Sequence, residues 1–325
     1  MEPGSHHPAH QNGDESNAMK HITLVLLVGA CAHLTPTLQA QAPCSSTVTG
    51  DLRIESFQST VYGDRRTVRI WLPADYSASE TTERRYPVLY LFDGQTIFDN
   101  CTAFANEREL QVDETTTRLI AEQMVPPMII VGIDSSGRRS HEYRPYKDAF
   151  ADPDGPEPVG RAIPEYLVKE VMPHVSARYR VTADPALTGI GGTSLGAIAA
   201  LYVLVNRSDR FGIGLLESPT LPVGNGQLLR DTMSLARGPD RVYIGVGTTE
   251  LDVPGGEEYA AQLRMPLAVA NAGFVRMSEM LAANLKSVHI NSPDVTLLVE
   301  PKGNHTSVSW ARRFPRALTA LYGPR

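Results

Sequence analysis

The chain has 325 residues, of which 42% are hydrophobic and 20% are charged, and its formal net charge is −6. This is the composition of an ordinary globular protein with enough apolar residues to bury a sizeable core. The acidic balance and the lack of a long Lys/Arg run argue against a nucleic-acid partner.

The N-terminal part of the sequence is predicted to lie outside the folded domain. Residues 1–18 are polar and look like a tag or non-native leader ahead of a second Met. An apolar run at 22–32 and a small-residue cleavage pattern at 40–42 follow, as in a secretory signal peptide. The run is shorter than the about 20 residues that a membrane-spanning helix needs. We therefore predict a signal peptide at 19–42, one domain at 43–325, and export to the periplasm or the outside of the cell. A buried first helix is the alternative.

The cysteines give two further predictions. Cys31 ends a segment that loosely resembles a bacterial lipobox, so a lipid anchor at Cys31 is an alternative to cleavage after Ala42. Cys44 and Cys101 remain as an even pair in an oxidising compartment, which predicts a disulfide between them. Two buried thiols are the alternative. Because the sequence has no Cys-x-x-Cys pair, no structural zinc site is expected.

The hydrophobic pattern predicts strands and helices that alternate along the chain. Residues 52–72 have strand chemistry with a turn at 62–64, which predicts an antiparallel hairpin. Short apolar runs bounded by Pro, Gly or polar residues then predict strands at 88–92, 128–133, 187–190, 213–216, 242–246 and 295–299. Helices are predicted at 107–123, 163–175, 195–205 and, with breaks, 257–286, with a closing helix from about Ser309. Strands that are apolar on both faces and alternate with helices indicate a largely parallel sheet covered on both sides.

One segment, Gly192-Thr193-Ser194-Leu195-Gly196, matches the Gly-x-Ser-x-Gly pattern of a nucleophile elbow. It lies between a predicted strand and a predicted helix, the setting that lifts a serine hydroxyl above the edge of the sheet. A glycine-rich turn that binds phosphate is the alternative, although no Gly-Lys-Ser/Thr follows. We predict that Ser194 is a nucleophile in a fold of the α/β-hydrolase type. That α/β fold has a mostly parallel central sheet, an N-terminal antiparallel hairpin and helices on both faces.

In such a fold the acid and then the histidine of the triad follow the serine in the sequence. Two histidines come later, His289 and His305, and His305 is preferred because it directly follows the last predicted strand. The acid should follow the strand at 242–246, where Glu250 and Asp252 are the carboxylates. Glu250 is preferred because it lies closer to the strand end, and Asp252 stays as the alternative.

An oxyanion hole needs two backbone N–H donors. One should belong to Leu195, the residue after the nucleophile. The other should come from the loop Asp93-Gly94-Gln95 after the strand at 88–92. Gln95 is preferred there, and Gly94 is the alternative.

These residues resemble those of the esterase D / enterochelin-esterase-like family of α/β-hydrolases. That family includes carboxylesterases, siderophore esterases, S-formylglutathione hydrolases, feruloyl esterases and mycolyltransferases. The matching segments are 86–95, 130–134, 142–145, 191–196, 242–250 and 303–305 together with Trp310. The resemblance implies Ser194, Glu250 and His305 as the triad. In length and exported single-domain form the chain looks more like the periplasmic siderophore esterases than the longer cytoplasmic enterochelin esterases.

The resemblance does not choose a substrate. Arg138, Arg139 and Arg144 lie near the predicted catalytic edge and are candidates to hold an anionic or catecholate group. Surface ion pairs with Asp148 or Asp152 are the alternative. We expect a small-molecule ester as substrate, no metal, no cofactor, no nucleic acid and no membrane span, while the oligomeric state is not predicted.

The expected activity is therefore hydrolysis of a carboxylic ester through an acyl-enzyme. An acyltransferase of the mycolyltransferase type, in which an acceptor other than water takes the acyl group, is one alternative. A hydrolase fold that only binds a ligand is the other.

Overall fold

The structure is a computed structural model that describes residues 44–104, 108–148, 155–288, 290 and 292–324. The predicted leader and signal peptide, the lipid-anchor candidate Cys31, and His289 lie outside the described residues. From Cys44 onward the chain clusters as one compact unit. None of the helices within these ranges has the length and apolar character needed to cross a membrane.

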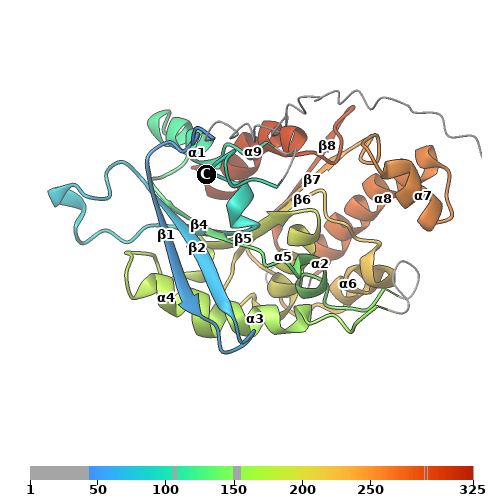
Figure 1. Cartoon of the computed structure of the whole chain (residues 1–325), viewed down its shortest axis with the longest axis horizontal. Coiled ribbons are helices and arrows are strands. Elements are labelled where there is room, and N and C mark those ends of the chain that lie inside the picture. Colours follow the sequence, from blue (N-terminus) through green and yellow to red (C-terminus); the bar gives the residue numbers. More distant parts are fainter. Residues whose placement is uncertain (1–43, 105–107, 149–154, 289, 291, 325) are drawn as a thin grey trace, which may run out of the picture. The chain divides into compact units, whose positions relative to one another are not determined.

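A central sheet of eight strands runs through the described part of the chain (Figure 1). The strand order is β1-β2-β4-β3-β5-β6-β7-β8. The β1–β2 hairpin is antiparallel, β2 pairs antiparallel with β4, and every other pair is parallel. The bounds are β1 (Asp51–Gln58), β2 (Arg65–Leu72), β3 (Val88–Phe92), β4 (Ile129–Ile133), β5 (Thr188–Thr193), β6 (Ile213–Glu217), β7 (Arg241–Gly247) and β8 (Asp294–Glu300). The predicted mostly parallel sheet with an N-terminal antiparallel hairpin is confirmed.

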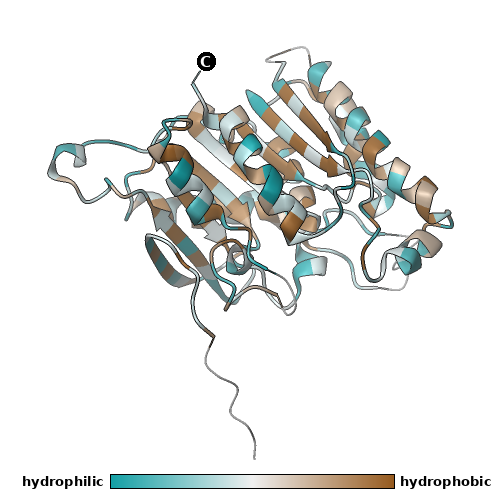
Figure 2. Cartoon of the chain, turned by 90° about the horizontal axis from the view of Figure 1, so that it is seen from above, coloured by the Kyte–Doolittle hydropathy of each residue, from teal (hydrophilic) through white to brown (hydrophobic). Residues whose placement is uncertain are grey.

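Helices cover both faces of this sheet (Figure 1). On one face α1 (Val112–Ala121) packs beside α9 (Ser307–Tyr322). On the other face lie α3 (Ile163–Tyr166), α4 (Met172–Ser176), α5 (Leu195–Arg207) and α8 (Leu267–Lys286). Figure 2 shows the hydrophobic residues gathered in the strands and the hydrophilic ones on helices and loops outside. Each face of the sheet thus has its own apolar core.

The remaining helical segments are short. They are α2 (Arg139–Glu142), α6 (Gln227–Asp231), α7 (Gly256–Gln262), η1 (Ser79–Thr81), η2 (Gly94–Thr96), η3 (Gly160–Ala162), the π-helical η4 (Leu167–Val171), η5 (Pro185–Leu187), η6 (Val223–Gly226) and η7 (Thr232–Ser234). Most of them were not predicted, because a single turn is too short to show a helical hydrophobic period.

Three helix predictions need correction, two at the first residue and one in the interior. The helix predicted from residue 107 begins at Val112, because Gln111 has a left-handed backbone (φ 52°) that interrupts the helix there. The helix predicted at 163–175 is divided by the π-helical η4, just ahead of Pro173, whose ring removes a backbone donor. The closing helix starts at Ser307, two residues early, because the Thr306 side chain caps it by accepting from the Ser309 N–H.

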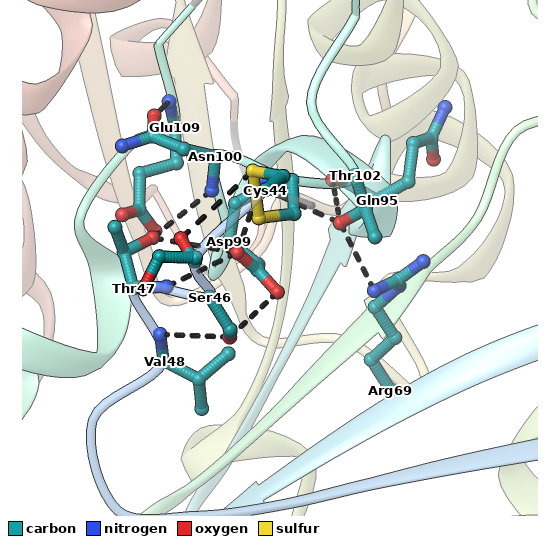
Figure 3. The surroundings of a disulfide bond; sticks show 12 residues. Cys44, Ser46, Thr47, Val48, Arg69, Gln95, Asp99, Asn100, Thr102 and Glu109 are labelled. Carbon is teal, nitrogen blue, oxygen red and sulfur yellow. Dashed lines mark hydrogen bonds between the residues drawn. A yellow bond between two sulfur atoms is a disulfide. The ribbon is translucent and has the colours of Figure 1, made fainter. Parts of the chain in front are cut away.

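A disulfide joins Cys44 to Cys101, with an S–S distance of 2.03 Å (Figure 3). The neighbouring Asp99 carboxylate accepts hydrogen bonds from the Ser46 hydroxyl at 2.8 Å and from the Thr47 N–H at 3.2 Å. These contacts hold the segment before β1 against the loop that follows η2 (Figure 3).

Breaking this disulfide is expected to lower the free energy of unfolding by about 2–4 kcal/mol, because a crosslink across a long loop restricts the unfolded chain. The two cysteines are 57 positions apart in the sequence. Urea unfolding with and without dithiothreitol measures the effect, and the Cys44→Ser/Cys101→Ser double variant should show no further shift with reductant. An unchanged midpoint after complete reduction would contradict the expectation.

Candidate active site

The elbow around Ser194 is a sharp turn between β5 and α5. Ser194 has φ 56° and ψ −122°, a strained backbone for a residue with a side chain. Its N–H donates to the Glu217 carbonyl at the end of β6, 2.9 Å away. A Cβ on Gly192 would lie 2.6 Å from the carbonyl carbon of Gly196, so only glycine fits there. The turn therefore holds the Ser194 hydroxyl at the carboxyl end of the parallel strands.

Two further loops bring a histidine and a carboxylate to this hydroxyl. His305, in the loop after β8, has its Nε2 2.8 Å from the Ser194 Oγ. The Nδ1 of the same ring lies 2.7 Å from the Glu250 Oε2, in the loop after β7. The His305 N–H also donates to the Glu250 carbonyl at 3.1 Å, which ties the two loops together. The three residues predicted as a triad thus form one continuous chain of hydrogen bonds.

The Glu250 carboxylate is fully buried and well supplied with donors. Its Oε1 accepts from the Gly247 N–H at 2.6 Å and from the Ser218 hydroxyl at 2.7 Å. Burial acts to raise the pKa of Glu250, but the hydrogen bonds from His305, Gly247 and Ser218 outweigh it and hold the pKa below its usual value. The alternative acid, Asp252, is exposed and accepts from the Asn271 amide at 2.9 Å. The geometry favours Glu250.

Ser218 is a buried residue of this site that was not predicted from the sequence. Its hydroxyl donates to Glu250 and accepts from the Trp310 indole N–H and from the Arg313 guanidinium, each at 2.9 Å. A hydroxyl has one hydrogen and two lone pairs, so these three bonds use its full capacity. Ser218 therefore fixes the Glu250 carboxylate to α9, which carries Trp310 and Arg313.

Arg313 sits between two more carboxylates behind the site. It donates to Glu217 at 2.7 Å and to Glu300 at 3.0 Å. Complete burial raises the pKa of Glu217 to about 7, although the Arg313 guanidinium opposes this. One feature of the sequence could have pointed to Glu217 and Ser218 as site residues. They are polar residues that directly follow the apolar run of β6, at the edge of the sheet where the other site residues lie.

Two backbone segments near Ser194 offer N–H donors for an oxyanion. Leu195 is the first residue of α5, and the first N–H groups of a helix lack partners within it. Gly94 and Gln95 open η2 in the same way, after Asp93 with φ 62°. The Gln95 side chain bonds with Ser135, its amide nitrogen 2.6 Å from the hydroxyl. Its role at the site is therefore confined to the backbone.

Two pockets meet at Ser194 and His305. The first, which we name the polar pocket, has a volume of about 140 Å³ and is lined by Asp93, Thr96, Phe104, Leu110, Arg139, Thr193, Ser194, His305, Ser307 and Trp310. The second, the apolar pocket, has a volume of about 290 Å³ and is lined by Ser194, Leu195, Thr220, Val223, Leu251, Val253, Pro254, Gly255, Gly256, Tyr259, Phe274 and His305. If the carbonyl of an ester lies at Ser194, the groups on its two sides would therefore extend into the two pockets.

Of the three arginines considered from the sequence, Arg139 alone lines either pocket in the described part of the chain. It holds the Asp93 carboxylate through two hydrogen bonds of 2.7 Å. Arg138 is exposed and pairs with Glu142 at 3.1 Å, and the Arg144 guanidinium donates to the Ser140 carbonyl at 2.7 Å. Thus only one of the three arginines, Arg139, lies at the site that was predicted for all of them.

Comparison with known proteins shows the family to which the chain belongs. Residues 59–321 match the family described as putative esterase. The uncharacterized protein YbbA of Bacillus subtilis is 24% identical over 267 residues, which are 80% of this chain and 94% of that protein. Ferri-bacillibactin esterase BesA, also of Bacillus subtilis, is 26% identical over 160 residues, which are 45% of this chain and 52% of that protein.

Among solved structures, an IroE-like serine hydrolase from Shewanella oneidensis superposes with a TM-score of 0.62 at 17% identity. The match covers 84% of this chain and 80% of that one, which shows a common fold. The family match covers most of the chain, so the protein belongs to the putative esterase family and is a carboxylic ester hydrolase, and its fold is that of the α/β-hydrolases.

Proposed function

We propose that this protein is an exported serine esterase that hydrolyses small-molecule carboxylic esters through an acyl-enzyme on Ser194. The observation that carries the proposal is the chain of hydrogen bonds from Ser194 through His305 to Glu250, at 2.8 and 2.7 Å. A serine hydroxyl is a weak nucleophile until a base in hydrogen-bond reach takes its proton, and the base needs a third group to orient it. Here the nucleophile, the base and the orienting carboxylate lie within hydrogen-bond distance of one another in that order.

The proposed reaction has two acyl-transfer steps. The His305 Nε2 takes the Ser194 proton as the Oγ attacks the ester carbonyl, while the buried Glu250 carboxylate orients the ring and stabilises its protonated form. The N–H groups of Leu195 and Gln95 hold the oxyanion, and His305 then returns the proton to the leaving alcohol. Water, activated by the same histidine, releases the acid from Ser194.

Two observations bear on compartment and substrate. The Cys44–Cys101 disulfide supports an oxidising location such as the periplasm or the outside of the cell, where such bonds persist. The similarity to ferri-bacillibactin esterase supports siderophore-type esters as one class to test. Other small esters stay in the same panel, since related hydrolase folds act on many substrates.

A fluorophosphonate probe tests the nucleophile directly. We expect one covalent adduct per chain, mapped by mass spectrometry to the peptide that contains Ser194, because the oxygen of an activated serine displaces fluoride from the probe and forms a phosphonate ester. The Ser194→Ala variant and heat-unfolded wild type serve as unlabelled controls. Native protein that hydrolyses esters but never labels at Ser194 would contradict the proposal.

The Ser218→Ala variant is expected to lower kcat about tenfold with little change in KM, because Glu250 loses one charge-assisted hydrogen bond. The pKa of Glu250 should rise, since that bond is one of the causes that lower it, so the loss of activity that accompanies protonation of Glu250 at low pH should begin at a higher pH. Steady-state kinetics across pH checks both, with Ser287→Ala, an exposed serine, as control. Unchanged kcat and an unchanged profile would show that Glu250 does not depend on Ser218.

A further inference from the structure

The two pockets at Ser194 differ in chemical character. Among the described residues, His305 is the only one with an ionisable nitrogen that lines the apolar pocket, and no carboxylate, lysine or arginine lines it. Its walls are mostly aliphatic or aromatic, with the buried Phe274 and Leu251 and the partly buried Val253. Hydroxyl groups line it at Ser194, Thr220 and Tyr259. A charged group placed there would lose water without meeting an Asp, Glu, Lys or Arg side chain of opposite charge.

The apolar pocket is also the larger one. An engineered cavity of roughly 150 Å³ in another protein holds a benzene ring, so a pocket of about 290 Å³ has room for an aryl ring or a medium alkyl chain. Five parts of the chain build it: the start of α5, the segment after β6, the loop that follows Glu250, the α7–α8 pair, and the loop after β8 with His305. Its position beside the Ser194 hydroxyl places any occupant next to the reacting carbonyl.

The polar pocket offers hydrogen bonds instead of apolar area. The Asp93 carboxylate and the Arg139 guanidinium face each other there at 2.7 Å, so opposite charges are already matched. The hydroxyl-bearing Thr193 and Ser307 also line this pocket. At about 140 Å³ it has half the volume of the apolar pocket, which suits a small group with hydroxyl or amide functions.

We infer that the substrate is an ester with an uncharged alkyl or aryl group on one side of the scissile bond and a small polar, hydrogen-bonding group on the other. The apolar pocket holds the first group and the polar pocket the second. This inference rests on the proposed function, since it is the attack by Ser194 that fixes the ester between the two pockets.

Two matched ester series test the inference. In one series the acyl chain grows (acetyl, butyryl, hexanoyl) on glycerol, and in the other the alcohol grows (ethyl, butyl, hexyl) on acetate. Each methylene that enters an apolar pocket should raise kcat/KM about fourfold. One series, and only one, is expected to rise by about 250-fold from first to last when all four added methylenes enter the pocket, because a single pocket is apolar. Within that series, a terminal carboxylate in place of a methyl group should lower kcat/KM about tenfold or more.

A pair of variants locates the effect. Val253→Trp fills the apolar pocket and is expected to remove the rise along the favoured series. Val269→Trp on α8, at an exposed position outside both pockets, should leave the series unchanged. A thermal unfolding curve of each variant confirms that it is folded. If Val253→Trp does not fold, the smaller Val223→Phe takes its place.

The possible results distinguish a failure of the inferred substrate class from a failure of the proposed function. Flat series, a rise in both series, or equal rates for the carboxylate analogue would overturn the inference while Ser194-dependent hydrolysis of the shortest esters still supported the proposed function. Hydrolysis that is equal in wild type and Ser194→Ala would overturn the proposed function itself.

Discussion

Replacing Ser194 with alanine is expected to lower kcat for ester hydrolysis by about six orders of magnitude, as loss of the nucleophile does in other serine hydrolases. The methyl group cannot form the acyl-enzyme, and the Oγ that lies 2.8 Å from the His305 Nε2 is gone. The fold should be retained, because alanine needs no more space than serine and the Ser194 N–H keeps its bond to Glu217.

Stopped assays with a p-nitrophenyl ester, in which wild type and variant are compared at equal folded concentration, measure this loss. Ser234→Ala, an exposed serine in η7, is the matched control and should keep wild-type kcat. Residual activity within about a hundredfold of wild type would mean that another group supplies the nucleophile.

The Glu250→Gln variant is expected to lower kcat by about four orders of magnitude, the size of effect seen when a triad acid becomes an amide. The Oε2 accepts from the His305 Nδ1, and the Oε1 accepts from Ser218 and Gly247. An amide offers one acceptor oxygen instead of two, so one of these donors would face an NH₂ group. The result favours the wrong imidazole tautomer and removes the charge that stabilises its protonated form.

Asp252→Asn provides the matched control for the choice of acid. Asp252 is two residues away but exposed and bonded to Asn271, so its loss should change kcat about threefold or less. Steady-state kinetics of both variants decides between the two carboxylates. A large loss in Asp252→Asn with near-normal Glu250→Gln would reverse the assignment.

Most of the fold was predictable because its signals are local. The buried strands of the parallel sheet are short apolar runs, and β3 was predicted with the bounds that it has in the structure, Val88–Phe92. The elbow at Ser194 could be found because a Gly-x-Ser-x-Gly turn between a strand and a helix has few other uses. The order of the strands then brings the loops after β7 and β8, with Glu250 and His305, to that same edge of the sheet.

What the sequence did not predict depends on contacts between distant residues. Ser218 and Arg313 are 95 positions apart, and no spacing rule connects a serine after β6 to an arginine on α9. The pairing of Arg139 with Asp93 likewise depends on how two loops fold over the sheet edge. The same holds for the two pockets, whose walls come from loops and short helices that carry little periodic signal.

The central claim is that Ser194 carries the acyl group during turnover, and rapid acid quench followed by mass spectrometry tests it most directly. Wild-type protein quenched during turnover of a slowly deacylating ester should gain the mass of one acyl group minus one hydrogen, on the peptide that contains Ser194. The Ser194→Ala variant should show no such gain. Steady turnover with Ser194 unmodified, or with the acyl group on another residue, would contradict the account.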